Sequence, residues 1–137
     1  MLSIFDQGQP SPCPAPFNMA AHVLGRAAQH PDKVALLVVG GDAIEVWTYG
    51  DLKAAVLGTG SGLLAAGLEP GDIVLMRLGN TVDFPLAYLG AIAAGLVPAP
   101  TAAGLTEREV SAMIATLSPR AVLRDPAVGK LQWHRSG

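Results

Sequence analysis

Residues 78–100 read LGNTVDFPLAYLGAIAAGLVPAP, and this stretch decides the fold. It predicts the end of a strand, a helix from about residue 80 to residue 94, and a short strand at 96–99. No Asp, Glu, Lys, Arg or His occurs between Asp83 and Glu107. A helix that is apolar on most faces has to be buried on most faces. A chain of 137 residues offers little material for that cover, so the stretch raises the question of whether the chain is a whole protein or the beginning of a larger one.

The same stretch must be compared with a membrane span, because residues 84–105 carry no charge and are long enough to cross a bilayer. Pro98 and Pro100 interrupt its second half, and much of the remainder is alanine, which inserts weakly. We therefore expect no membrane span, but a buried helix followed by a buried strand.

Composition excludes several classes of protein. Half of the residues are hydrophobic, at 50%, so a folded core is expected and disorder of the whole chain is not. The net charge is -2, Lys and Arg are scattered singly, and aromatic residues make up 5%. Without a basic stripe or a stacking surface, we expect no nucleic-acid partner.

The N-terminal sequence and the cysteine content bear on location. The start, MLSIFD, has neither a cationic segment nor a long apolar run, so it does not resemble a signal peptide. Cys13 is the only cysteine, and it lies among prolines, which is typical of an incidental exposed thiol. We therefore expect a cytoplasmic protein.

The chain divides into three predicted parts. Prolines at positions 10, 12, 14 and 16 favour a flexible, extended arm over residues 1–17. Residues 18–125 carry the periodic patterns of a folded unit. Residues 126–137 show no clear periodicity and stay unassigned.

The folded unit begins with a helix and a hairpin. Asn18 is a good N-cap for a helix that is expected to run to His30, where Pro31 ends it. Residues 34–39 (VALLVV) and 43–47 (AIEVW) predict two strands, and the Gly-Gly-Asp turn between them predicts a β-hairpin.

Helices and strands then alternate. Thr48 and Asp51 have the spacing of a capping box that opens a helix to about residue 66, with Gly67 as its stop. A buried strand is predicted at 73–78, followed by the helix and strand of the opening stretch. A second capping box at Thr106 and Glu109 opens a helix to about residue 117, and a last strand follows at 120–123. This order predicts an α/β fold with a hairpin and a largely parallel sheet flanked by helices.

The glycines at 58, 60 and 62 resemble a phosphate loop, but Leu63 occupies the position of the third glycine in the dinucleotide fingerprint. They also lie inside a helical pattern instead of a strand-to-helix turn. A GxSxG nucleophile motif fails as well, because Thr59 stands where its first glycine is required. We interpret these glycines as places where a helix packs closely.

The titratable residues form no recognisable site. His22, His30 and His134 are far apart and lack metal-ligand spacing. Helix capping explains the acidic residues in predicted first turns, namely Asp51, Asp83 and Glu109. Glu69 and Asp72 flank a turn as solvated charges. We therefore assign no catalytic, cofactor-binding or metal-binding residue.

Nine short segments follow one another along residues 18–123: NMA at 18–20, HPDKVAL at 30–36, WTYGDL at 47–52, GLEPGDIV at 67–74, NTVDFP at 80–85, YLGAIAAG at 88–95, VP at 97–98, LT at 105–106 and RAVL at 120–123. In this order and spacing they resemble the N-terminal part of the AMP-forming acyl-CoA synthetases, in the adenylate-forming superfamily. The resemblance covers about residues 18–125, and the wording of residues 81–85 is similar to benzoate-CoA ligases.

The resemblance implies a two-step reaction in which ATP activates a carboxylic acid, aromatic or fatty, as an acyl-adenylate that CoA then takes over. ATP, Mg²⁺ and CoA would serve the full-length enzyme. The family's nucleotide-binding motifs do not occur in this sequence, so no site residue is carried over and the chain alone is expected to be inactive. Its partner would be the remainder of a ligase domain, or a second copy through its apolar surface.

Two other hypotheses remain open at this stage. The chain could be a small α/β module without catalytic activity that binds a partner protein through its apolar helix surface. It could also be a nucleotide-binding doubly wound domain, which binding of ATP or NAD would reveal. A compact soluble monomer would favour the module, whereas self-association would favour an incomplete domain.

Overall fold

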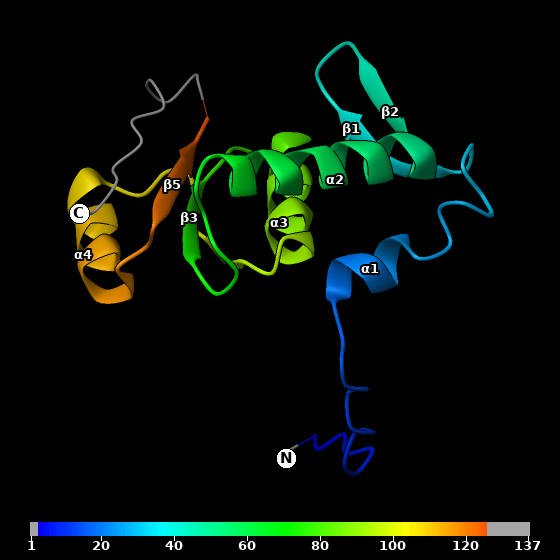
Figure 1. Ribbon diagram of the computed structural model, residues 1–137, viewed down its shortest axis with the longest axis horizontal. Coiled ribbons are helices and arrows are strands. Elements are labelled where there is room, and N and C mark those ends of the chain that lie inside the picture. The colour runs from blue at the N-terminus through cyan, green and yellow to red at the C-terminus, as the bar shows by residue number, and fades with distance from the viewer. Residues whose placement is uncertain (1–2, 126–137) are drawn as a thin grey trace.

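The computed structural model of the chain describes residues 3–125 (Figure 1). Its elements follow the predicted order of helix, hairpin and alternating helices and strands. They are α1 (Met19–Leu24), β1 (Val34–Val39), β2 (Ile44–Thr48), α2 (Tyr49–Ala65), β3 (Ile73–Arg77), α3 (Asp83–Ala93), β4 (Val97–Pro100), α4 (Glu107–Leu117) and β5 (Ala121–Arg124).

The predicted parallel sheet consists of three strands in the order β4-β3-β5. β3 is central and pairs in parallel with both neighbours, with Leu75 opposite Ala99 on β4 and Val122 on β5. Each of these strands is linked to the next through a helix, which is the connection that a parallel sheet needs. The α/β fold class predicted from the sequence is therefore confirmed.

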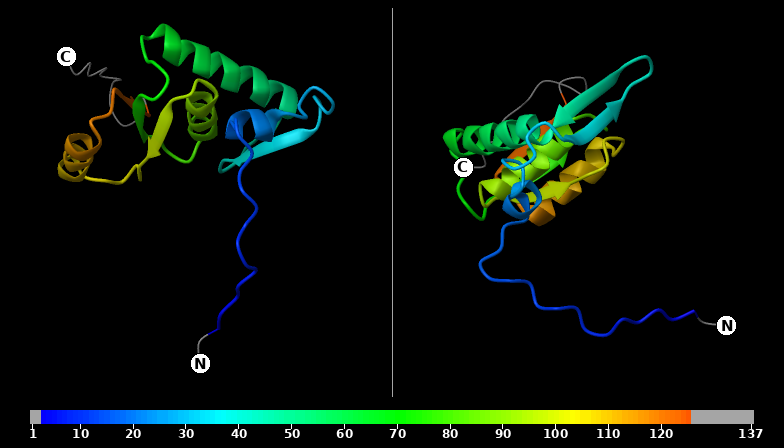
Figure 2. Two further views of the ribbon diagram at one scale, coloured as in Figure 1. Left: turned by 60° about the horizontal axis from the view of Figure 1, so that its bottom comes forward. Right: turned by 90° about the vertical axis from the view of Figure 1, so that its right-hand side faces the viewer.

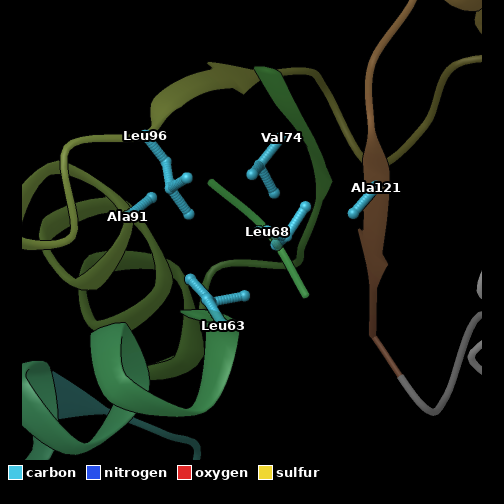
Figure 3. Close-up of a cluster of buried hydrophobic side chains, with 6 residues drawn as sticks. All are labelled: Leu63, Leu68, Val74, Ala91, Leu96 and Ala121. Carbon is cyan, nitrogen blue, oxygen red and sulfur yellow. The ribbon is translucent and has the colours of Figure 1, made fainter. Parts of the chain in front are cut away.

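Helices cover both faces of this sheet. On one face, Leu63 of α2 and Ala91 of α3 pack against Val74 of β3 (Figure 3). On the other face, Val110 of α4 packs against Leu75 and Val122. Neighbouring residues of a strand point to opposite faces, so Val74 and Leu75 each serve as the centre of one apolar layer. Both are fully buried.

β1 and β2 form a separate antiparallel sheet of two strands, as the sequence predicts. The amide of Gly40 donates to the carbonyl of Ala43 at 2.9 Å and closes the turn. The hairpin lies beside the first turns of α2 and extends away from the three-stranded sheet (Figures 1 and 2).

The caps predicted from the sequence form as expected. Thr48 accepts from the amide of Asp51, whose carboxylate accepts from the amide of Thr48. Thr106 and Glu109 form the same pair at the start of α4. Gly67 has a φ of 92°, the left-handed conformation expected of the residue that stops α2.

The first helix is shorter than predicted. Asn18 caps it by accepting from the amide of Ala21, but α1 ends at Leu24 and does not reach His30. Separate turns follow, in which Gly25 donates to the carbonyl of His22 at 3.3 Å. A glycine in a helix costs about 1 kcal/mol relative to alanine, and a helix of this length has few bonds with which to offset that cost.

Two large apolar side chains on the helices are exposed, Val23 on α1 and Leu64 on α2. On the same helices Leu24, Leu52, Val56 and Leu63 are buried.

Residues 3–17 run away from the folded part in both views of Figure 2. None of the helices in residues 3–125 is long and apolar enough to cross a membrane. The unassigned tail at 126–137 and His134 lie outside the described residues.

Candidate functional site

Open α/β sheets commonly bind ligands at the carboxyl ends of their parallel strands. In this chain the central strand ends at Arg77, whose side chain is 5% exposed. Its Nη1 donates to Oε1 of Glu107 at 2.8 Å, and its Nη2 donates to the carbonyl oxygen of Leu105 at 2.9 Å. Both terminal nitrogens are thus engaged in joining the end of β3 to the start of α4.

Glu107 lies between two guanidinium groups. Beside its bond to Arg77, its Oε2 is 3.9 Å from Nη2 of Arg124 on β5. The hydrogen bond from Arg77, followed by the charge of Arg77, lowers the pKa of Glu107 below its ordinary value, and the charge of Arg124 acts in the same direction. The carboxylate therefore stays ionised at neutral pH and cannot serve as a general acid there.

Thr101 closes the neighbouring strand end. Both its amide and its hydroxyl donate to the carbonyl of Met76, each at 2.9 Å. The threonine is buried, so its hydroxyl is not available to a ligand. The carboxyl edge of the sheet is therefore occupied by structural bonds among the described residues.

Arg77 has one further property that the sequence did not reveal. Its Nε is buried and has no hydrogen-bond partner among residues 3–125. We did not single out Arg77 from the sequence, although a charged residue that ends the otherwise apolar strand IVLMR was a signal for it.

The acidic residues singled out from the sequence serve the helix starts. Hydrogen bonds from Thr48 lower the pKa of Asp51, and hydrogen bonds from Thr106 lower the pKa of Glu109. Asp83 lies in the first turn of α3 but makes no capping bond there. Asp72 accepts from the amide of Glu69 at 2.8 Å and so fixes the turn before β3.

His22 and His30 do not belong to a metal-binding cluster of the described residues. His22 lies on α1 and His30 in the turns after it, and both are exposed. They line an open cavity of about 590 Å³ together with Arg26, Lys33 and Tyr49. Within residues 3–125, no three His, Cys, Asp or Glu side chains are close enough to hold a metal ion. Cys13 is an exposed free thiol in the arm.

A second cavity of about 440 Å³ lies between α1 and α2. Small and apolar side chains dominate its wall, including Leu24, Leu57 and Ala93, with Lys53 as the charged residue. A third, of about 290 Å³, runs between β1 and the loop before α3. None of these cavities contains the paired acid and base that hydrolysis or proton transfer requires.

The glycine segment 58–62 also serves packing. A Cβ on Gly60 would lie 2.9 Å from the carbonyl oxygen of Gly90 on α3, which is closer than real Cβ atoms approach. Gly58 and Gly62 have nothing within 4 Å of such an atom. The prediction of close helix packing is therefore confirmed at Gly60 and wrong for its two glycine neighbours, which face away from α3.

Comparison with known proteins identifies the family. Residues 24–135 match the family of AMP-binding enzymes. The chain is 32% identical over 125 residues to the benzoate–CoA ligase of Thauera aromatica, a match that covers 87% of this chain and 23% of that enzyme.

Solved structures agree with this match. The crystal structure of a benzoate CoA ligase from Burkholderia xenovorans LB400 superposes with a TM-score of 0.74 at 30% identity, over 82% of this chain and 22% of that chain. The inhibitor-bound N-terminal domain of FACL13 from Mycobacterium tuberculosis gives a TM-score of 0.70 at 27% identity, over 77% of this chain and 26% of that chain.

The chain thus spans about a quarter of the length of these relatives. The matched residues 24–135 include the helix and strands of the uncharged stretch with which the sequence was first interpreted. The resemblance inferred from short segments is therefore confirmed. The chain belongs to the family of AMP-binding enzymes, and its fold is that of the N-terminal part of their acid–CoA ligases.

Proposed function

We propose that this chain is the N-terminal scaffold of an AMP-forming acid–CoA ligase. In the complete enzyme a substrate carboxylate oxygen would attack the α-phosphorus of ATP and displace pyrophosphate. The thiol of CoA would then attack the carbonyl carbon of the acyl-adenylate, and AMP would leave. The observation that carries the proposal is the family match over residues 24–135 together with the shared fold.

The described residues do not fit a site for ATP, Mg²⁺ or CoA. Mg²⁺ prefers oxygen ligands from carboxylates, yet Asp51, Glu107 and Glu109 accept hydrogen bonds within the fold. The guanidinium of Arg77, which is suited to phosphate, is bound to Glu107 and Leu105. We therefore assign no chemical step to these residues, and infer that the ligands bind to other parts of the enzyme.

An aromatic carboxylic acid is the substrate class that we propose. Three relatives share at least 32% identity with this chain over their matched stretches, and their names specify benzoate, 4-hydroxybenzoate or benzoate, and 4-coumarate. The proposal rests on these similarities.

The partner that we propose is the remainder of a ligase domain. The hairpin exposes several large apolar side chains, and most of α3 is only half-buried by the described residues. Exposed apolar surface of this kind marks an interaction site. We further propose that residues 1–17 form a flexible arm outside the domain, and that the enzyme is cytoplasmic.

The test is release of pyrophosphate from ATP in the presence of Mg²⁺ and benzoate. The purified chain alone is expected to give no release above the protein-free control. The chain co-expressed with the part of the Thauera aromatica benzoate–CoA ligase that follows the matched stretch is expected to give release that depends on both proteins. Robust release by the chain alone, or none by a soluble co-purified pair, would contradict the proposal.

A further inference from the structure

The hairpin presents one apolar face to the solvent. Leu37 pairs with Val46 across the two strands, and Val39 pairs with Ile44. All four side chains are exposed, Val39 at 76%. Glu45 and Trp47 alternate with them, and a hydrogen bond of 2.7 Å joins their side chains on the opposite face. The strands therefore place no charged side chain on the apolar face.

The backbone at the edge of β1 is also available. Gly40 and Ala43 are a hydrogen-bonded pair at the turn, and such pairs alternate along antiparallel strands. By this alternation Val39–Ile44 and Leu37–Val46 are pairs without mutual hydrogen bonds. The amide and carbonyl groups of Leu37 and Val39 then point outward, away from β2. A row of this kind is a template for another strand.

A groove runs along this edge. Residues 36–39 of β1 form one wall, and Asn80, Thr81 and Pro85 form the other, around a space of about 290 Å³. The second wall comes from the loop that joins β3 to α3 and from Pro85 in the first turn of α3, so the groove connects the hairpin to the three-stranded part of the fold.

From these observations we infer that the edge of β1 accepts an extended, apolar strand from the part of the ligase domain that this chain does not contain. The inference rests on the proposed function and names the surface through which the two parts join. The added strand would bond to the outward groups of Leu37 and Val39, and its side chains would extend the apolar face beside those of Leu37 and Val39.

The lengths of the relatives support this occupant over a small ligand or an unrelated protein. The matched stretch is only 22% of the Burkholderia benzoate CoA ligase, so most of that enzyme lies outside the stretch. A two-stranded sheet is marginally stable by itself, and three or more strands with an apolar face are needed for independent stability.

Proline substitutions can test the edge directly, because proline removes an amide donor yet is tolerated at the outer edge of a sheet. Val39→Pro removes a donor from the edge of β1. Val46→Pro is the matched control, since Val46 lies on the same apolar face but directs its amide to the edge of β2. Val39→Lys is a second variant that keeps the amide and places a charge on the face.

Each variant is co-expressed in tagged form with the part of the Burkholderia benzoate CoA ligase that follows the matched stretch. Recovery of that part on the tagged chain is measured, and circular dichroism checks that each variant is folded. We expect Val39→Pro and Val39→Lys to weaken the complex by about ten-fold, as a lost backbone bond and a buried charge predict. Val46→Pro should leave recovery close to that of the unsubstituted chain.

The possible failures are distinguishable. If the unsubstituted chain recovers none of the soluble partner, the proposed function itself fails. If recovery is strong and Val39→Pro behaves like Val46→Pro, the β1 edge is not the joining surface, although the proposed function stands. If sedimentation shows that the chain alone dimerises and Val39→Pro abolishes the dimer, a second copy occupies the edge and the inference is overturned.

Discussion

Gly60 of α2 and Gly90 of α3 meet at the point where their helices cross. A Cβ on Gly90 would lie 2.8 Å from the side chain of Thr59 and 3.2 Å from the amide nitrogen of Gly60. Thr59 cannot easily turn away, since its hydroxyl donates to the carbonyl of Ala55 at 2.8 Å. The two glycines thus set how closely the uncharged helix approaches its neighbour.

Gly60→Ala is expected to destabilise the fold. The new methyl group would press on the carbonyl oxygen of Gly90, a backbone atom, and overpacking of this kind costs about 1–3 kcal/mol. Alanine recovers about 1 kcal/mol of helix propensity, and because the clash is with a backbone atom we expect a net loss of up to about 2 kcal/mol. Urea unfolding followed by circular dichroism measures it.

Gly62→Ala on the same helix is the control for this prediction. A Cβ there meets nothing within 4 Å, so only the propensity gain of about 1 kcal/mol applies and stability should rise. If both substitutions shift the urea midpoint in the same direction, the close approach of α2 and α3 does not limit stability.

Glu107→Ala is expected to lower stability more than Arg77→Met does. Loss of the carboxylate leaves a buried guanidinium with one acceptor fewer, whereas methionine removes the buried charge altogether. In the Arg77→Met background, Glu107→Ala should then have little further effect. The measurement is a double-mutant cycle of urea midpoints, and strictly additive changes would contradict the coupling of the two residues.

Acid should weaken the junction between β3 and α4. Arg77 holds the pKa of Glu107 below its ordinary value of 4.5, so the folded state binds the proton less readily than the unfolded chain. The stability that Glu107 contributes is therefore present above that value and is lost as the pH falls through the lowered pKa. Asp51 and Glu109 add the same dependence through their caps.

This dependence can be assigned to Glu107 by comparing urea midpoints at neutral pH and at about pH 3. The drop should be smaller in Arg77→Met than in the unsubstituted chain, because no guanidinium then favours the ionised carboxylate. An equal drop in both proteins would show that the caps alone carry the effect.

Amide exchange should distinguish the two kinds of backbone group on β1. In the isolated chain the amides of Leu37 and Val39 point away from β2 and should exchange faster than that of Val38, which faces Glu45 in a hydrogen-bonded pair. Slow exchange at all three would mean that the edge of β1 is already covered.

Local signals predicted most of the elements. The residues VALLVV at 34–39 coincide with β1, and the pair Thr48–Asp51 marks the start of α2 as a capping box should. Such features depend on neighbours in sequence. The end of α1 could not be predicted in this way. Hydrogen bonds of the turns after Gly25 replace those of the helix, and a periodic pattern does not show them.

Features that depend on distant neighbours were harder to predict. The residues near Arg77 in sequence do not predict its hydrogen bonds to Leu105 and Glu107, because α3 and β4 separate these partners from Arg77 along the chain. The exposure of one face of the hairpin could not be predicted for a similar reason. An apolar run such as VALLVV predicts burial on both sides, and the described residues cover only one.

We propose that this chain supplies scaffold and that the chemistry resides elsewhere in the enzyme. The most direct test is a chimera in which residues 18–125 replace the matched stretch of the Thauera aromatica benzoate–CoA ligase, assayed for pyrophosphate release with a panel of acids. We predict a folded enzyme that releases pyrophosphate in dependence on ATP and Mg²⁺, forms the acyl-CoA when CoA is added, and keeps the acid preference of the recipient. A folded chimera without pyrophosphate release, or one whose acid preference follows the inserted segment, would contradict the account.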